Sequence, residues 1–302
     1  MKILIMLSTY NGELYLDKQL QSIFDQDVEA SIYLFVRDDG SVDKTLEILH
    51  KWEDRLKILY LKDNERLGAA KSFWKLLMNA PEADYYAFVD QDDIWDKNKL
   101  AKAISAIGNT EEKVLWFSNC RIISSDGKLI DDSFHKRELS FNISTLMICG
   151  CVQGCAMVFN NASFRYIKSL HYSSIPMHDI VIMQYILANG KLVYDPSPYF
   201  SYRVHSNNAD SKMGKSFIAG IRHSLEKYCG KDGRYAYSQF ASDFVNNCEN
   251  ILDDRDKLYL SNLSNCKHSL LSRLYILHSS MTECTNKKAL RSFKIRVALG
   301  II

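Results

Sequence analysis

The stretch Tyr85–Trp95, which reads YYAFVDQDDIW, gives the first indication of the fold of this chain. Its short apolar run is typical of a buried strand, and Asp90, Asp92 and Asp93 follow within four positions. Like charges this close raise one another's pKa unless a positive group offsets them. A divalent cation would do so, since Mg²⁺ and Mn²⁺ bind carboxylate oxygens together with substrate phosphates. A solvated acidic turn is the alternative, and for an isolated D-x-D pattern it is the better interpretation.

The bulk properties exclude several classes of protein. Hydrophobic residues make up 47% of the 302 residues and charged residues 25%, which is ordinary for a globular protein. The net charge of +2 gives no signature of a nucleic-acid partner. No apolar run approaches the roughly 18 residues of a membrane span, and Met1–Leu7 is too short for a signal peptide. A cytoplasmic protein is expected.

The eight cysteines agree with a reducing compartment. Cys149, Cys151 and Cys155 are clustered in an apolar segment, but a zinc site would need paired clusters and a disulfide framework a small secreted chain. Cys155 has no neighbouring base in the sequence that could activate it as a nucleophile, so we expect an inert, buried thiol.

Strands and helices alternate four times before residue 105, which predicts a parallel sheet with helices on both faces. The expected strands are 2–7, 31–36, 56–61 and 85–89, and the expected helices are 13–24, one from residue 43 to residue 52, and one through residues 73–77. Polar segments follow three of these strands, at Ser8–Gly12, Asp38–Ser41 and Asp90–Asp93. Ligands bind beyond the carboxyl ends of such strands, so these segments predict one site. No G-x-G-x-x-G or G-x-x-x-x-G-K-[ST] motif is present.

The second half of the chain predicts strands at 114–123 and 191–194, an irregular loop at 131–139, and helices within 216–263 and 269–299. Apolar spacing after Asp179 indicates a helix with this residue in its first turn, where a carboxylate is a common cap. The tail Asn286–Ile302 is basic and amphipathic. Such a segment can lie on an anionic membrane surface, and packing against the catalytic domain or a dimer partner is the alternative.

Three motifs, in this order and spacing, resemble the family 2 glycosyltransferases: Met6–Gly12 (MLSTYNG), Arg37–Thr45 (RDDGSVDKT) and Asp90–Trp95 (DQDDIW). The last is most similar to the bacterial rhamnosyltransferase-like branch. The resemblance implies an α/β fold of the GT-A nucleotide-sugar-binding type, with a mostly parallel central sheet and a C-terminal helical extension. It implies a catalytic domain at 1–212, with a nucleotide-sugar half at 1–105 and an acceptor half at 106–212. Residues 213–302 would form the helical region.

The resemblance also implies roles for individual residues. The nucleotide sugar would contact Ser8, Thr9, Tyr10, Asn11, Asp38, Asp39, Lys71, Asp90, Gln91 and Arg203. Within this set, Tyr10 would offer a ring face for stacking of the base and Asp39 would hydrogen-bond the base. Asp38 would support the turn that contains Asp39, and Arg203 would pair with phosphate. A Mn²⁺ or Mg²⁺ ion would be held by Asp92, Asp90 and His205. Trp95, Gly154, Cys155 and His178 would line the acceptor side, and Asp179 would be the general base.

The expected reaction is inverting, metal-dependent transfer of a sugar from a nucleoside-diphosphate donor, either dTDP-rhamnose or a UDP-hexose. The expected acceptor is a glycan or an undecaprenyl-diphosphate-linked glycan in bacterial surface polysaccharide synthesis, which would place the enzyme at the cytoplasmic face of the inner membrane. A sugar nucleotidyltransferase is one alternative, although it would usually carry a Gly-rich basic loop where Ser8–Gly12 stands. An inactive sugar-binding module is the other, and the joint presence of Asp39, Asp90, Asp92 and Asp179 argues against it.

Overall fold

The structure is a computed structural model that describes residues 1–63, 65–136, 139, 141–149, 152–205, 236–284 and 286–302. It divides into two compact units. The first comprises Met1–Leu139, Val152–Lys168 and Gly190–Ser211, and the second comprises Ser140–Cys151, Ser169–Asn189 and Lys212–Ile302. These units are interleaved along the chain, and the domain boundaries expected from the sequence stay a prediction.

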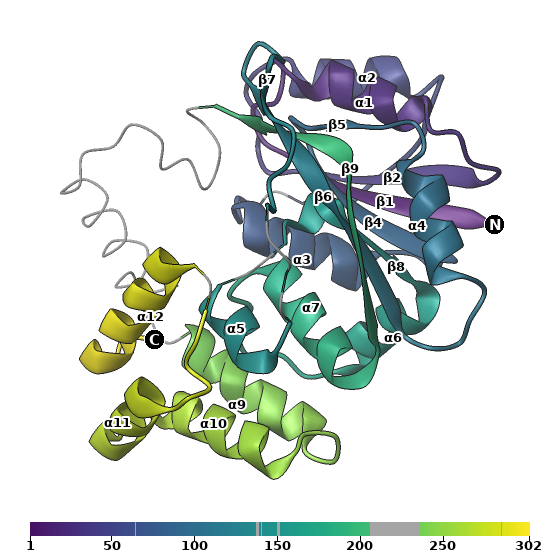
Figure 1. Cartoon of the computed structure of the whole chain (residues 1–302). Coiled ribbons are helices and arrows are strands. Elements are labelled where there is room, and N and C mark those ends of the chain that lie inside the picture. Colours follow the sequence, from purple (N-terminus) through teal and green to yellow (C-terminus); the bar gives the residue numbers. More distant parts are fainter. Residues whose placement is uncertain (64, 137–138, 140, 150–151, 206–235, 285) are drawn as a thin grey trace. The chain divides into compact units, whose positions relative to one another are not determined.

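The first unit is built on one sheet with the strand order β3-β2-β1-β4-β8-β6-β9-β5, and β7 pairs with β6 (Figure 1). The strands are β1 (Lys2–Thr9), β2 (Ser31–Asp38), β3 (Lys57–Tyr60), β4 (Tyr85–Asp90), β5 (Ile94–Trp95), β6 (Val114–Ser124), β7 (Leu129–Asp131), β8 (Met157–Asn160) and β9 (Lys191–Val204). The helices are α1 (Leu16–Phe24), α2 (Thr45–Trp52), α3 (Ala69–Asn79), α4 (Lys99–Ile107), the short 3-10 helix η1 (Gly154–Ala156) and α6 (Asn161–Ser169).

Strands β1 to β4 pair in parallel, as the alternation of strands and helices predicts. The chain steps from β1 to β2 and β3, and then returns to place β4 on the other side of β1. Right-handed crossovers therefore put α1 and α2 on one face of the sheet and α3 on the other. This reversal makes the carboxyl ends of β1 and β4 a topological switch point, the place where open α/β sheets bind ligands.

The two central strands explain why their sequences are continuously apolar. Ile3–Leu7 of β1 and Tyr86–Val89 of β4 are fully buried. A parallel strand covered on both faces needs apolar side chains at every position rather than at alternate ones. Polar residues therefore begin only where each strand leaves the core.

The second half of the sheet corrects the expectation of a mostly parallel sheet. Strand β8 is antiparallel to β4 and β6, β7 is antiparallel to β6, and β5 is antiparallel to β9, whereas β6 and β9 are parallel. The sheet is therefore mixed. The regular strand–helix alternation that imposes parallel pairing ends at β4, and strands joined without a regular crossover are free to pair antiparallel.

Strand β9 is longer than the expected strand at 191–194 because it continues through Pro196 and Pro198. Its register with β6 shifts between Ser118 and Asn119, opposite these prolines. Proline has no N–H to donate to a neighbouring strand, so it is accommodated where the pairing is irregular. The extension carries Arg203 to the loop that follows β4.

The second unit is helical, with α5 (Ile143–Ile148), α7 (His178–Asn189), α9 (Ala236–Cys248), α10 (Asp254–Asn265), α11 (Leu270–His278) and α12 (Lys287–Leu299). Four of these helices begin at a residue whose side chain accepts a hydrogen bond from a backbone N–H three positions on. These caps are Asn142, Asp253, Ser269 and Asn286. Tyr185 of α7 packs against Phe240 and Phe244 of α9.

The C-terminal helices expected from the sequence are confirmed where the structure describes them. The segment 269–299 contains two helices, since α11 ends at His278 and a second, capped helix begins after Asn286. Of the segment 216–263, residues 216–235 lie outside the described residues. Among the helices that are described, none has the length and apolar character that a membrane crossing requires.

Candidate active site

The three polar segments meet at the carboxyl edge of β1, β2 and β4. In the sheet register, Ser8 stands opposite Asp90 of β4, and Thr9 stands opposite Asp38 of β2. The Thr9 hydroxyl donates to Asp38 at 2.8 Å, and the backbone N–H of Asp39 donates to the carbonyl of Thr9 at 2.8 Å. The strand ends are thus tied to one another by short polar contacts.

Gln91 fixes the loop that contains Tyr10. Its side-chain oxygen accepts from the N–H of Tyr10 at 2.9 Å, and its amide nitrogen donates to the carbonyl of Tyr10 at 2.9 Å. A Cβ on Gly12 would collide with the same side-chain oxygen, so a larger residue at this position would have to displace the Gln91 side chain. The structure therefore gives Gln91 a loop-holding function, and the nucleotide-sugar contact predicted for it stays a prediction.

The ring of Tyr10 is presented at the surface. It is 38% exposed, and the guanidinium of Arg66 lies 4.3 Å from the ring centroid. Asn11 has a φ of 47°, a left-handed conformation that asparagine tolerates better than most residues. The side chain of Asn11 accepts from the N–H of Val42 at 2.9 Å, which joins this loop to the one after β2. An exposed ring on a braced loop is compatible with the predicted stacking of a nucleotide base.

Asp39 is buried and accepts hydrogen bonds from other groups of the chain. Its carboxylate accepts from Arg37 at 2.6 Å and from the backbone N–H groups of Leu67 and Gly68 at 2.7 and 2.8 Å. Burial by itself raises the pKa of Asp39, but these hydrogen bonds outweigh it, so the pKa lies below its ordinary value. Arg37 also binds Asp63 through two nitrogens. Asp39 therefore has a structural function, and the hydrogen bond to the nucleotide base that is expected of it stays a prediction.

Asp38 organises the turn that follows β2. One carboxylate oxygen accepts from Thr9 and from the hydroxyl of Ser41, and the other accepts from the N–H groups of Gly40 and Ser41. Asparagine and aspartate are favoured in such turns because their short side chains satisfy nearby backbone donors. The support of the turn that was expected of Asp38 agrees with this geometry.

Asp92 is paired with His205. The imidazole Nε2 lies 2.8 Å from a carboxylate oxygen of Asp92, and the two side chains are only 11% and 13% exposed. The ring of His205 stacks on that of Tyr15, with the centroids 5.0 Å apart. The two residues are 113 positions apart in the sequence, yet the structure brings together two of the three predicted metal ligands.

Arg203 lies beneath the Asp92 loop and is 1% exposed. Its Nε donates to the carbonyl of Asp92 at 2.7 Å, and a terminal nitrogen donates to the carbonyls of Ser124 and Ser125, both at 3.1 Å. Its backbone N–H donates to Asp93 at 3.1 Å. These contacts brace the loop between β4 and β5, and the phosphate contact predicted for Arg203 stays a prediction.

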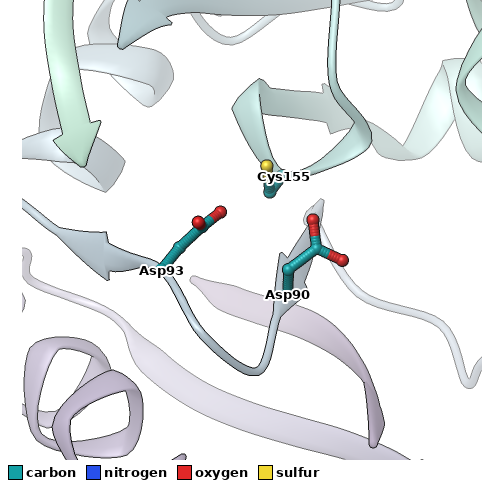
Figure 2. A group of neighbouring side chains, drawn as sticks. All are labelled: Asp90, Asp93 and Cys155. Carbon is teal, nitrogen blue, oxygen red and sulfur yellow. The ribbon is translucent and has the colours of Figure 1, made fainter. Parts of the chain in front are cut away.

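Asp93 is fully buried, and Figure 2 shows its carboxylate directed toward Cys155, with Asp90 at the end of β4 nearby. One potential ligand atom from each of the three lies within 4.8 Å of the others. Burial, followed by the negative charges of Asp92 and Asp90, raises the pKa of Asp93 well above its ordinary value. Burial also raises the pKa of Cys155 well above its ordinary value, so the expected inert, buried thiol agrees with the structure.

These residues fit a divalent cation. Carboxylates and a neutral imidazole are donors that Mn²⁺ accepts, and Mg²⁺ is commonly bound through one or two carboxylates. The oxygen Oδ2 of Asp93 is buried and, among the described residues, has no hydrogen-bond partner. A cation among Asp90, Asp92 and Asp93 would satisfy this oxygen and offset the clustered charge.

Lys99 is a buried residue to which the sequence assigned no function. It has no exposed surface, and its ammonium lies 3.9 Å from the ring centroid of Trp95 and 4.5 Å from that of Phe200. It donates to the carbonyl of Cys155. Burial lowers the pKa of Lys99 to about 8. A lysine in the first turn of an amphipathic helix gives no sequence signal of such a position. Trp95, expected on the acceptor side, is 3% exposed and packs against this ammonium.

The remaining predicted residues lie in different surroundings. Lys71 is exposed near the start of α3, and Gly154 is buried at the start of η1. His178 and Asp179 begin α7 in the second unit, and the carboxylate of Asp179 accepts from the N–H of Ile180 at 2.7 Å. Burial lowers the pKa of His178 to about 3, so this imidazole is neutral. The approach of Asp179 to the edge formed by the first unit stays a prediction.

A parallel four-stranded half-sheet with a carboxylate loop at its switch point defines a nucleotide-binding α/β protein of the GT-A type. The model of the family Glycosyl transferase family 2 matches residues 4–167, and the chain belongs to this family. The chain is a glycosyltransferase, as predicted.

Relatives and solved structures agree with this assignment. The chain is 28% identical over 224 residues to the dTDP-rhamnosyl transferase RfbG of Shigella flexneri, covering 67% of this chain and 72% of that protein. It is 30% identical over 137 residues to the putative teichuronic acid biosynthesis glycosyltransferase TuaG of Bacillus subtilis, covering 44% of this chain and 52% of that protein. The structure of TarS 1–349 of S. aureus in complex with UDP-GlcNAc superposes with a TM-score of 0.61 at 17% identity, covering 98% of this chain and 79% of that chain. This likeness confirms the predicted GT-A fold.

Proposed function

We propose that this enzyme transfers a sugar, with inversion, from a nucleoside-diphosphate sugar to a hydroxyl of a glycan or of an undecaprenyl-diphosphate-linked glycan in bacterial surface polysaccharide synthesis. The observation that carries the proposal is the Asp92–His205 pair at the β1/β4 switch point, beside the exposed ring of Tyr10. The similarity to RfbG favours a dTDP-rhamnose donor, and the fold shared with TarS keeps a UDP-hexose as the alternative.

Within this proposal, the ring of Tyr10 offers a face to the nucleotide base, and Thr9, Asn11 and Asp38 fix the loops around it. A Mn²⁺ or Mg²⁺ ion held by Asp90, Asp92 and His205 would offset the charge that develops on the leaving diphosphate. A mannosyltransferase of Pyrobaculum calidifontis with a similar fold is known in complex with GDP-Man and Mn²⁺. This supports the choice of metal.

Asp179 is proposed to accept the proton of the attacking hydroxyl. It lies in the first turn of α7, where the helix N-terminus stabilises a carboxylate. A general base must reach the hydroxyl within hydrogen-bond distance. The proposal therefore requires the second unit to present Asp179 to the edge of the first. A cytoplasmic location is part of it, and the free, buried thiols of Cys120 and Cys155 suit a reducing compartment.

Release of nucleoside diphosphate from a panel of dTDP- and UDP-sugars, with Mn²⁺ and a glycan acceptor, tests the function. Asp92→Asn and Asp179→Asn are each expected to lower the rate by at least about a hundredfold, the usual contribution of a catalytic acid–base group. Asp126→Asn, at an exposed hairpin turn, is the matched control and should transfer like the wild type. Near-normal transfer by Asp179→Asn would overturn the assignment of the base. A nucleotidyltransferase would instead convert these donors to nucleoside triphosphate and sugar 1-phosphate, and only when pyrophosphate is added, whereas an inactive module would release nothing.

A further inference from the structure

Helix α11 exposes an apolar face that the fold does not use. Leu270, Leu271 and Leu274 are 68%, 79% and 44% exposed, whereas Ser272 and Ile276 are buried. At about 100° per residue, the three leucines lie within roughly 100° of the helix circumference. Single exposed leucines are ordinary, but three on one face of a short helix form an unpartnered apolar strip.

Helix α12 adds positive charge beside this strip. Helices α11 and α12 contact each other within the second unit, and the guanidinium of Arg273 lies against Gly300 at the end of α12. The exposed side chains of α12 lie within an arc of roughly 120°. They are basic in its first turns, at Lys287, Lys288 and Arg291, and include the apolar Ile295 and Leu299 near its end.

The charge of this region is one-sided. Residues 266–302 contain seven Lys and Arg residues and one acidic residue, Glu283. The whole chain has 38 Lys and Arg residues and 36 Asp and Glu residues, so basic residues are fewer than acidic residues outside this segment. The positive charge is therefore concentrated where the exposed leucines are.

We propose that the exposed faces of α11 and α12 bind the surface of an anionic lipid bilayer, a function that goes beyond sugar transfer. The leucines enter the boundary between headgroups and acyl chains, and the lysines and Arg291 bind the anionic headgroups. A second copy of the chain is the other natural occupant of an apolar strip. A symmetric dimer through this surface would place like charges opposite one another, which is unfavourable.

Co-sedimentation of the full chain with vesicles tests the proposal. The wild type is expected to bind vesicles of phosphatidylcholine with roughly 30% phosphatidylglycerol at least about tenfold more tightly than pure phosphatidylcholine in about 0.1 M salt, and to lose this preference in about 0.5 M salt. Leu271→Ser/Leu274→Ser and Lys287→Gln/Lys288→Gln/Arg291→Gln are each expected to weaken binding to the anionic vesicles at least about tenfold.

Matched controls come from the first unit. Leu46→Ser, at an exposed leucine of α2, and Lys51→Gln/Lys57→Gln/Lys102→Gln, at three exposed lysines, should bind vesicles like the wild type. All the positions changed are solvent-exposed, so melting temperatures should stay within about 1 °C of the wild type, and a melt of each variant checks this. Equal binding to both kinds of vesicle, or an equal loss in the control variants, would overturn the proposal. A dimer that forms without lipid and dissociates in Leu271→Ser/Leu274→Ser would assign the surface to a second copy instead. Vesicle binding does not depend on transfer activity, so its outcome is separate from that of the proposed function.

Discussion

Replacement of Arg203 by methionine distinguishes between two functions of this residue. The sequence predicts that Arg203 binds the donor phosphates, whereas the structure buries its guanidinium against the carbonyls of Asp92, Ser124 and Ser125. If the loop-holding function is correct, Arg203→Met must unfold more easily, because it leaves three carbonyls without their charged donor. If Arg203 only binds phosphate, stability should not change.

The expected loss can be estimated from these contacts. A hydrogen bond from a charged donor contributes about 1.5–3 kcal/mol. The two bonds made by one terminal nitrogen share a donor group, so the three bonds together contribute about 3–5 kcal/mol rather than their full sum. For a domain of this size, about 1 kcal/mol corresponds to roughly 2–4 °C, so the melting temperature should fall by roughly 10 °C.

Thermal unfolding followed by circular dichroism, together with the nucleoside-diphosphate release assay, measures both effects. Arg165→Met is the matched control, because the side chain of Arg165 is 62% exposed and its loss should change the melting temperature by no more than about 2 °C. If Arg203→Met has the same melting temperature as this control but no longer transfers sugar, the loop-holding function is refuted and phosphate binding is supported.

Three further perturbations follow from the structure. The pKa of Asp39 and that of Asp63 are lowered in the folded state, so the stability that these carboxylates add is present above pH about 4 and is lost in more acidic solution. In urea unfolding, Asp39→Asn/Asp63→Asn should be less stable than the wild type at pH 7, and its stability should depend less on pH. The pKa of Lys99 is lowered to about 8, so the folded state releases this proton before the unfolded state does, and stability should rise from pH 8 to about 10 in the wild type but less in Lys99→Met. A Cβ at position 12 would collide with the side-chain oxygen of Gln91, so Gly12→Ala should displace Gln91, lower the melting temperature and raise the donor KM several-fold. In Gly12→Ala/Gln91→Ala the collision is removed, so the melting temperature should recover while the KM stays raised.

The parallel half of the sheet could be predicted because its signals are local. Apolar runs long enough for buried strands alternate with helical spacing, and polar residues begin where each strand leaves the core. Once β1, β2 and β4 are parallel neighbours, their carboxyl ends must meet, which brings Ser8, Thr9, Asp38 and Asp90 together. The antiparallel second half could not be predicted in this way, because strand direction after β4 depends on long-range pairing.

The partners of individual side chains were harder to predict. Asp38 and Asp39 are adjacent in the sequence, yet one caps an exposed turn while the other is buried against Arg37 and the amides of Leu67 and Gly68. Nothing local to the pair decides which carboxylate faces which donor. Lys99 is a similar case, because its burial depends on aromatic rings from β5 and β9 that meet only in the fold.

The structure also answers the question of how a buried strand can end in three carboxylates. Burial and the negative charges of Asp92 and Asp90 raise the pKa of Asp93 well above its ordinary value, which favours its neutral form. Arg203 supplies positive charge to the same loop, because its guanidinium donates to the carbonyl of Asp92 and its backbone N–H donates to Asp93. Asp92 is also paired with His205 at this edge. A cation bound there together with a diphosphate, as proposed, would offset the remaining charge of the carboxylates.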